Sequence, residues 1–255
     1  MNKKGSHVGA MLSFVIFITF LIFLYSILQP ALKTEADKQD TVDYLTSKLR
    51  ENFSSGLLSV TINITYWSNG PGKSCVSVQN ILTGIEEQGL NKDLLIIKNS
   101  TNSILPYFIE SNGNDLSIRT GEQFDSFFKI YSSNDINSSK CTTAKTSCVG
   151  TCYSSNSGYE IRSVGQINET FLKKVRTFKT NYESSTGAYD SIKTQLKVPS
   201  NMEFSFIFKT EEGGNINTST KIPPTTANVY VGETPVLYVD ENANLKSGFL
   251  TVKVW

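Results

Sequence analysis

Apolar residues dominate the beginning of the chain. After Lys3 and Lys4 no charged residue occurs before Lys33, and the run over 8–28 is almost wholly apolar. A helix of that length rises about 30 Å, which matches the hydrocarbon core of a bilayer. The run is longer than the apolar part of a secretory signal, and no small-x-small cleavage site follows it. We therefore predict a retained transmembrane helix over residues 6–29.

The charges that flank this span predict its orientation. Two lysines precede it, whereas the residues after it carry balanced charges: Lys33, Glu35, Asp37 and Lys38. Positive residues favour the cytoplasmic side, so residues 1–5 are expected to form a short basic cytoplasmic leader, with the chain outside from about residue 31. This predicts a single-pass protein of the cell membrane, with a cytoplasmic N-terminus, an extracellular C-terminal domain and the lipid bilayer as a partner.

An amphipathic pattern continues the span. Six apolar residues recur at spacings near three, four and seven, with charged residues between them: Leu32, Ala36, Val42, Leu45, Leu49 and Phe53. This periodicity predicts a stalk helix over residues 30–54 that has one apolar face.

Beyond the stalk the period changes to two. From Leu58 to Tyr66 every even position is apolar and every odd position polar, as in a half-buried strand. Further strand candidates are 74–78, 94–98, 116–119, 124–131, 203–208, 229–231, 236–239 and 248–255, and the pair around Gly232–Pro235 indicates a hairpin. Such alternation indicates antiparallel sheet.

One further helical segment is predicted among these strands. Asn168 is a candidate N-cap for a helix that is broken at 184–187, after which a shorter helix runs to Pro199. The predicted fold class is α+β: a long N-terminal transmembrane and stalk helix, then an antiparallel β-rich extracytoplasmic domain over 55–255. A Ser-, Asn- and Thr-rich loop divides this domain into possible lobes at 55–165 and 166–255.

Four cysteines lie on the predicted outer side, where disulfides persist: Cys75, Cys141, Cys148 and Cys152. In one scheme Cys148 pairs with Cys152, and Cys75 is left for Cys141. In the other, Cys141 pairs locally and Cys75 reaches one of the later two. A zinc site of four thiolates is the alternative, but the chain lacks the two CxxC motifs that such sites usually show.

Asn-x-Ser/Thr sequons provide candidate glycosylation sites, given the predicted topology. They occur at Asn52, Asn63, Asn99, Asn137, Asn168 and Asn217.

Composition excludes several classes of function. The net charge is +1, so there is no basic excess to neutralise a nucleic-acid backbone. The single histidine is His7, which leaves the exterior domain without imidazole catalysis or a His-containing zinc site. The segment 240–244 imitates the start of a calcium loop, but Leu245 and Thr251 replace the required Gly and Glu. We predict a turn there and expect no enzyme, no cofactor and no metal site.

The N-terminus resembles that of type IV pilin-like proteins, particularly archaeal ones. The resemblance covers about fifty residues and rests on the basic leader ending in Lys3-Lys4-Gly5, the apolar span and its amphipathic continuation. In that family a membrane peptidase cuts after the glycine, and the apolar helices pack into a filament core. The resemblance therefore implies processing at Lys4, Gly5 and Ser6, with the cut between Gly5 and Ser6, and packing against copies of the chain or other pilin-like subunits.

Two functions are consistent with these features. The first is a pilin-like structural subunit that displays a β-rich exterior domain. The alternative is a monomeric anchored binding module for a glycan, a peptide or a surface protein, which needs neither the leader nor the apolar stripe of the stalk. An anchored enzyme ranks third, because no residue pattern indicates one.

Overall fold

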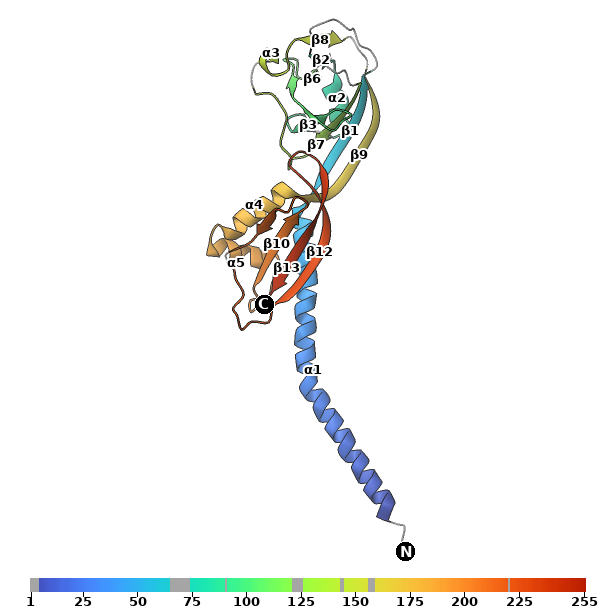
Figure 1. The fold of residues 1–255 in the computed structure, drawn as a ribbon, viewed down its shortest axis with the longest axis vertical. Coiled ribbons are helices and arrows are strands. Elements are labelled where there is room, and N and C mark those ends of the chain that lie inside the picture. The colour runs from blue at the N-terminus through green and yellow to red at the C-terminus, as the bar shows by residue number, and fades with distance from the viewer. Residues whose placement is uncertain are drawn as a thin grey trace.

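The computed structural model is elongated, with one long helix at one end and two lobes stacked beyond it (Figure 1). It describes residues 5–64, 74–89, 91–120, 126–142, 145–155, 159–219 and 221–255. Within these segments, the side chains of 5–8, 29–37 and 153–155 are outside the description. Lys4 of the predicted leader therefore lies outside the described residues, as do the side chains of Gly5 and Ser6.

The described residues form five helices and thirteen strands. The helices are α1 (Gly5–Phe53), α2 (Ile81–Glu86), α3 (Lys145–Cys148), α4 (Leu172–Glu183) and α5 (Thr186–Gln195). The first strands are β1 (Ser54–Ile64), β2 (Cys75–Val78), β3 (Leu95–Lys98), β4 (Ile104–Leu105), β5 (Tyr107–Ile109), β6 (Leu116–Arg119) and β7 (Phe127–Ser132). The later strands are β8 (Cys152–Ser155), β9 (Tyr159–Phe171), β10 (Phe204–Thr210), β11 (Asn215–Asn217), β12 (Tyr230–Val239) and β13 (Leu245–Val254).

α1 joins the two predicted helical segments, 6–29 and 30–54, into one helix of 49 residues. It ends at Phe53 and passes directly into β1, close to the point where the apolar period changes from that of a helix to that of a strand. The predicted α+β fold class is confirmed, because a long apolar helix precedes a domain that consists mainly of sheet.

A nine-stranded sheet extends through both lobes in the order β11-β10-β13-β12-β9-β1-β7-β3-β4. Its long central pair, β1 and β9, is antiparallel and bridges the two lobes (Figure 1). A second sheet of order β5-β6-β2-β8 packs against it in the outer lobe. Most neighbouring strands are antiparallel, as predicted, but β12 pairs with β9 and β2 with β8 in parallel.

Each lobe has its own hydrophobic core. In the inner lobe, α1 packs with α4, α5 and one face of β10, β12 and β13 through Val42, Leu45, Leu49 and Phe53. In the outer lobe, β1, β3 and β7 pack against β2, β5, β6 and α2. The lobes 55–165 and 166–255 stay a prediction, since one sheet crosses both cores.

Three local predictions are wrong. The hairpin expected around Gly232–Pro235 is instead one continuous strand, β12, which pairs with β13 along its whole length. Over most of that length β13 is its only strand neighbour, and an edge of this kind tolerates the missing N–H of Pro235. Asn168 does not cap α4: it lies in β9 opposite Gly56, because the ladder with β1 continues as far as Thr170, and Phe171 precedes the helix.

The count of helices is the third correction. The predicted segment is present as α4 and α5, and the break expected at 184–187 lies at Ser184 and Ser185. The short helices α2 and α3 come in addition. Both have fewer than two turns, so they carry too little periodicity to show in the sequence.

Candidate functional site

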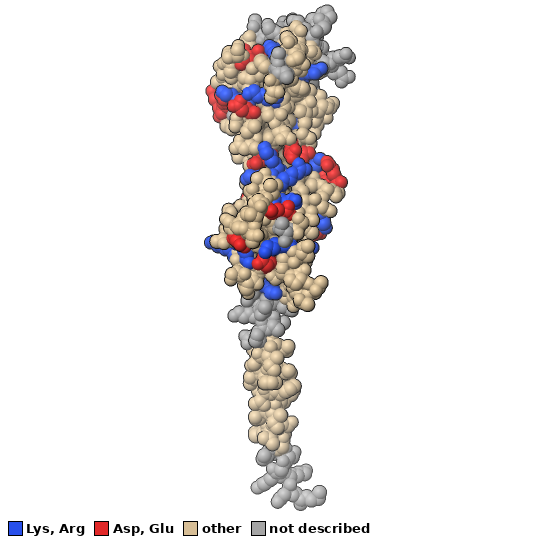
Figure 2. All heavy atoms as spheres, turned by 90° about the vertical axis from the view of Figure 1, so that its left-hand side faces the viewer, with Lys and Arg blue, Asp and Glu red and all other residues tan. Residues whose placement is uncertain are grey.

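The N-terminal half of α1 is the most distinctive surface of the protein. Gly9–Leu28 is a helical stretch of 20 residues with a mean hydropathy of 2.6, long and apolar enough to cross a membrane. None of it is buried against the domain, and its large side chains are exposed all round the helix, among them Phe14, Phe17 and Leu21. No charged side chain interrupts its described surface in Figure 2. A helix that is apolar on every side and uncovered requires an apolar environment.

The C-terminal half of α1 is, in contrast, part of the inner-lobe core. Val42, Leu45, Leu49 and Phe53 are fully buried, whereas Tyr44 between them is exposed. The predicted apolar stripe is therefore real over this half, and its cover is the protein's own sheet and α4. The side chains of the other two stripe residues, Leu32 and Ala36, lie outside the described part of the chain.

Close contacts fix α1 against the sheet. A Cβ atom on Gly232 of β12 would come within 2.6 Å of Val42 Cγ1, so the helix lies where only a glycine leaves room. Farther along, the ring of Phe53 packs edge-on against Phe178 of α4, with 5.3 Å between centroids, and 5.6 Å from Phe206 of β10. The helix and the inner lobe therefore form one packed body.

Two disulfides bind the outer lobe. Cys75 pairs with Cys152 and Cys141 with Cys148, which is the second of the two predicted schemes. The first pair joins β2 to β8 at positions that are directly opposite in their parallel register. No cysteine is free, so no thiolate is left for a zinc ion. Both bridges surround Val149, which is fully buried among them.

The six sequon asparagines differ in accessibility. Asn137 in a loop, Asn168 on β9 and Asn217 on β11 are exposed. The other three are half-buried, at the end of α1, on β1 and in a loop: Asn52, Asn63 and Asn99. The amide of Asn52 donates to the Lys48 carbonyl at 3.0 Å, and that of Asn137 donates to Glu241 Oε2 at 3.2 Å. Glycosylation at these six residues stays a prediction.

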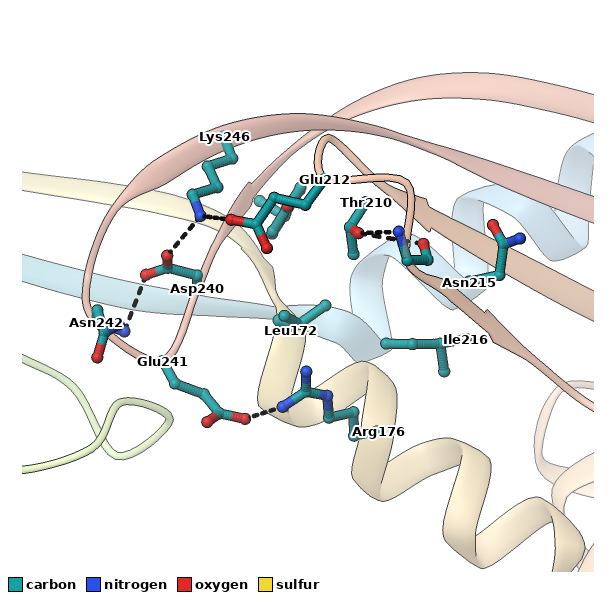
Figure 3. Close-up of a pocket in the computed structure, with 12 residues that line it drawn as sticks. Leu172, Arg176, Thr210, Glu212, Asn215, Ile216, Asp240, Glu241, Asn242 and Lys246 are labelled. Atoms are coloured by element: carbon teal, nitrogen blue, oxygen red, sulfur yellow. Dashed lines mark hydrogen bonds and ion pairs between the residues drawn. The ribbon is translucent and has the colours of Figure 1, made fainter.

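A polar cleft lies between the N-terminal turn of α4 and the turns that follow β10 and β12 (Figure 3). Its volume is about 620 Å³. Its ionisable lining consists of Arg176, Glu212, Asp240, Glu241 and Lys246. Of this cleft only the turn 240–244 is recognisable in the sequence, because the remaining cleft residues come from distant segments that share no pattern.

The charges of the cleft are paired with one another. Lys246 Nζ bonds Glu212 and also lies 3.1 Å from Asp240 Oδ2, while Arg176 pairs with Glu241 (Figure 3). Hydrogen bonds to Glu212 and Asp240 raise the pKa of Lys246. Each of these five charged side chains has an oppositely charged partner, so the arrangement joins three chain segments, and none of the described lining residues presents an unpaired charge.

Asp240 organises the turn between β12 and β13. Its Oδ1 accepts the backbone N–H groups of Asn242 and Asn244, both at 2.9 Å, and its Oδ2 accepts the Asn244 side-chain amide at 2.9 Å. Burial alone would raise the pKa of Asp240, yet these bonds and Lys246 outweigh it and lower that pKa. The turn predicted at 240–244 is confirmed, and its carboxylate is committed to the turn itself.

Within the described residues, no three His, Cys, Asp or Glu side chains are grouped so that they could hold a metal ion. None of the protein families, curated proteins and solved structures with which we compared the chain matches it.

Proposed function

We propose that this protein is a membrane-anchored surface subunit that assembles in the manner of type IV pilins. The N-terminal half of α1 spans the bilayer, the β-rich domain stands outside, and the apolar helix packs against the helices of neighbouring subunits. The two disulfides support an oxidising exterior for the domain. The lysines before the span support a cytoplasmic N-terminus.

One observation carries this proposal: a single continuous helix is wholly exposed over its apolar first half and embedded in the domain core over its second half. An anchor alone needs only a flexible linker to its domain. A helix that is also part of the core fixes the orientation of the domain relative to the membrane helix. Repetitive assembly requires that fixed orientation, because each subunit must present the same surfaces to its neighbours.

Processing of the leader is part of the same proposal. A cut between Gly5 and Ser6 would leave only Ser6 and His7 ahead of the apolar run over 8–28, so the apolar helix would carry almost no polar extension at its end. Removal of the basic residues would free the helix to leave the bilayer and enter an apolar bundle. The binding-module alternative receives no such support, since the charges of the polar cleft are already paired.

Cysteine scanning in native membranes tests the assembly. The four natural cysteines are bound in disulfides, so an added cysteine is the only free thiol. Single substitutions at Ile16, Phe17, Ile18 and Thr19 sample all sides of the exposed helix. We expect oxidation to give covalent dimers at one or two of these positions, because packed helices face each other on one side.

Dispersal of the same membranes in excess detergent is the control and should abolish the dimers. Equal yields at all four positions would indicate random collision, and no dimers at any of them would indicate a monomer. Either result would refute assembly through this helix and favour the anchored module.

A further inference from the structure

A lysine is buried between the two lobes. Lys98, the last residue of β3, is 1 % exposed. It adjoins the small apolar cluster that lies between the two cores, and its Nζ stands 5.1 Å from the centroid of the Tyr131 ring in that cluster. Lysine is almost never fully buried without a charged partner. None of the ion pairs among the described residues includes Lys98.

Instead, the amine of Lys98 donates hydrogen bonds to the side-chain amide of Asn244 and to a backbone carbonyl. Lys98 Nζ lies 2.7 Å from Asn244 Oδ1 and 3.1 Å from the Ala243 carbonyl oxygen, both in the turn between β12 and β13. The same Oδ1 also accepts a hydrogen bond from Asn102 Nδ2 at 3.2 Å. The two contacts of Nζ orient the amine toward the side-chain carbonyl of Asn244, and the Asn102 contact polarises that carbonyl.

A carboxylate stands on the other side of the amide. Asp240 Oδ2 accepts from Asn244 Nδ2 at 2.9 Å, and its position is fixed by the backbone N–H groups of the turn and by Lys246. The described residues thus bring together a nucleophile, an electrophile and a proton carrier: Lys98, Asn244 and Asp240.

We propose that Lys98 and Asn244 form an intramolecular isopeptide bond, Nζ to Cγ, with Asp240 as the proton carrier. This modification site does not depend on the proposed function of the N-terminal helix.

The chemistry of this step balances without any other reactant. Burial lowers the pKa of Lys98, and the positive charges of Lys129 and Lys246 lower it further, whereas the negative charge of Asp240 raises it. The lowered pKa favours the neutral amine, which is the form that can attack a carbonyl carbon. The Nζ lone pair forms a bond to Cγ of Asn244, while the Asn102 amide stabilises the negative charge on Oδ1.

Breakdown of this intermediate releases ammonia. Nζ and Nδ2 are then attached to the same carbon, so the carboxylate that already contacts Nδ2 can take a proton from Nζ and give it to Nδ2. The Cγ–Nδ2 bond breaks and Nδ2 leaves as ammonia. A primary amine and a primary amide have become one secondary amide, and nothing has been oxidised or reduced.

The bond would join the lobes covalently. β3 lies in the outer-lobe part of the nine-stranded sheet, and the turn joins β12 and β13 in its inner-lobe part, where it reaches toward the outer lobe (Figure 1). The bonded residues are 146 apart in sequence. A link of this kind resists pulling along the molecule, because the lobes could not separate around β1 and β9 without breaking it.

Tryptic digestion of the reduced full-length protein, made in a host without N-glycosylation, tests the proposal directly. Trypsin does not cut after an acylated lysine, so we expect the peptide 93–119 joined to the peptide 222–246. The joined species should be lighter than the sum of the two by about 17 Da, the mass of one ammonia. Free peptides 93–98 and 99–119, together with an unmodified 222–246, would overturn the proposal and leave a hydrogen-bonded contact only.

Variants test the assigned roles. Lys98→Arg keeps the charge and hydrogen-bond donors but has no amine that can attack, and Asn244→Ala has no amide, so both should lack the joined peptide. Lys129→Arg is the matched control: Lys129 faces Lys98 on β7 and is exposed, and its variant should keep the link. Asp240→Asn should slow formation by about a hundredfold. An unchanged rate in that variant would refute the role of Asp240.

Discussion

Truncation of Leu45 to alanine tests whether the second half of α1 belongs to the core of the domain. Leu45 is fully buried in the inner-lobe cluster between Val42 and Leu49. Leu→Ala at such a site removes about 2–5 kcal/mol from the free energy of unfolding, because transfer energy is lost and a cavity remains. For a domain of about 200 residues each kcal/mol lowers the melting temperature by about 2–4 °C, so a loss of about 3 kcal/mol predicts a fall of about 6–12 °C.

The same helix provides a matched control. Leu28→Ala makes the same change at a side chain that is 55 % exposed and touches no part of the domain. It should change the free energy of unfolding by no more than about 0.5 kcal/mol. The assay is thermal unfolding of the full-length protein in a mild detergent, followed by near-ultraviolet circular dichroism, which reports the packed aromatic side chains of the domain. Equal melting temperatures for the two variants would refute the claim that α1 is part of the core.

Three further predictions concern contacts elsewhere. Gly232→Ala should lower the free energy of unfolding by about 1–3 kcal/mol, because the added methyl group clashes with Val42. Gly187→Ala, at an open position in α5, should raise the free energy of unfolding by about 0.5–1 kcal/mol, and chemical denaturation measures both changes. Burial alone would raise the pKa of Glu183, but Lys179 and Ser219 bond its carboxylate and lower that pKa. The contribution of Glu183 to the free energy of unfolding is therefore complete above its ordinary pKa of 4.5, and it is lost as the pH falls through the lower pKa of the folded state. Glu183→Gln should consequently lose less stability than the wild type on acid titration. Alkylation of the unreduced, denatured protein should label none of the four cysteines, and labelling of two or more would contradict the disulfides.

The sequence predicts those elements whose periodicity is undisturbed. The stripe Val42, Leu45, Leu49 and the alternation of β1 from Val60 to Ile64 each follow one period, and both are present in the structure. β9 shows the opposite case. Its register with β1 shifts between Thr61 and Ile62, which breaks the alternation of its own side chains, and most of its residues are exposed. No single period therefore reveals this strand, although it is one of the two that hold the lobes together.

Contacts between distant segments could not be predicted either. Lys98 follows a short apolar run and has the sequence appearance of a strand-ending solvated lysine. Lys98 is buried because the turn that contains Asn244 packs over it. This turn is far away in sequence and lies beside Lys98 only once the nine-stranded sheet has formed. The polar cleft has the same origin, since Arg176, Glu212 and Lys246 meet only after three segments have packed. All three pairings of the four cysteines are open in the sequence, and the parallel register of β2 and β8, which places Cys75 opposite Cys152, selects one of them.

The central claim is that the exposed half of α1 anchors an exterior domain in the membrane. Ser247→Cys places a thiol on an exposed position of β13, and the natural cysteines are all in disulfides. We expect this variant to remain in the membrane pellet after an alkaline carbonate wash, and its thiol to react with a membrane-impermeant maleimide on intact cells. Release of the protein by carbonate, or labelling only after the cells are lysed, would contradict the account.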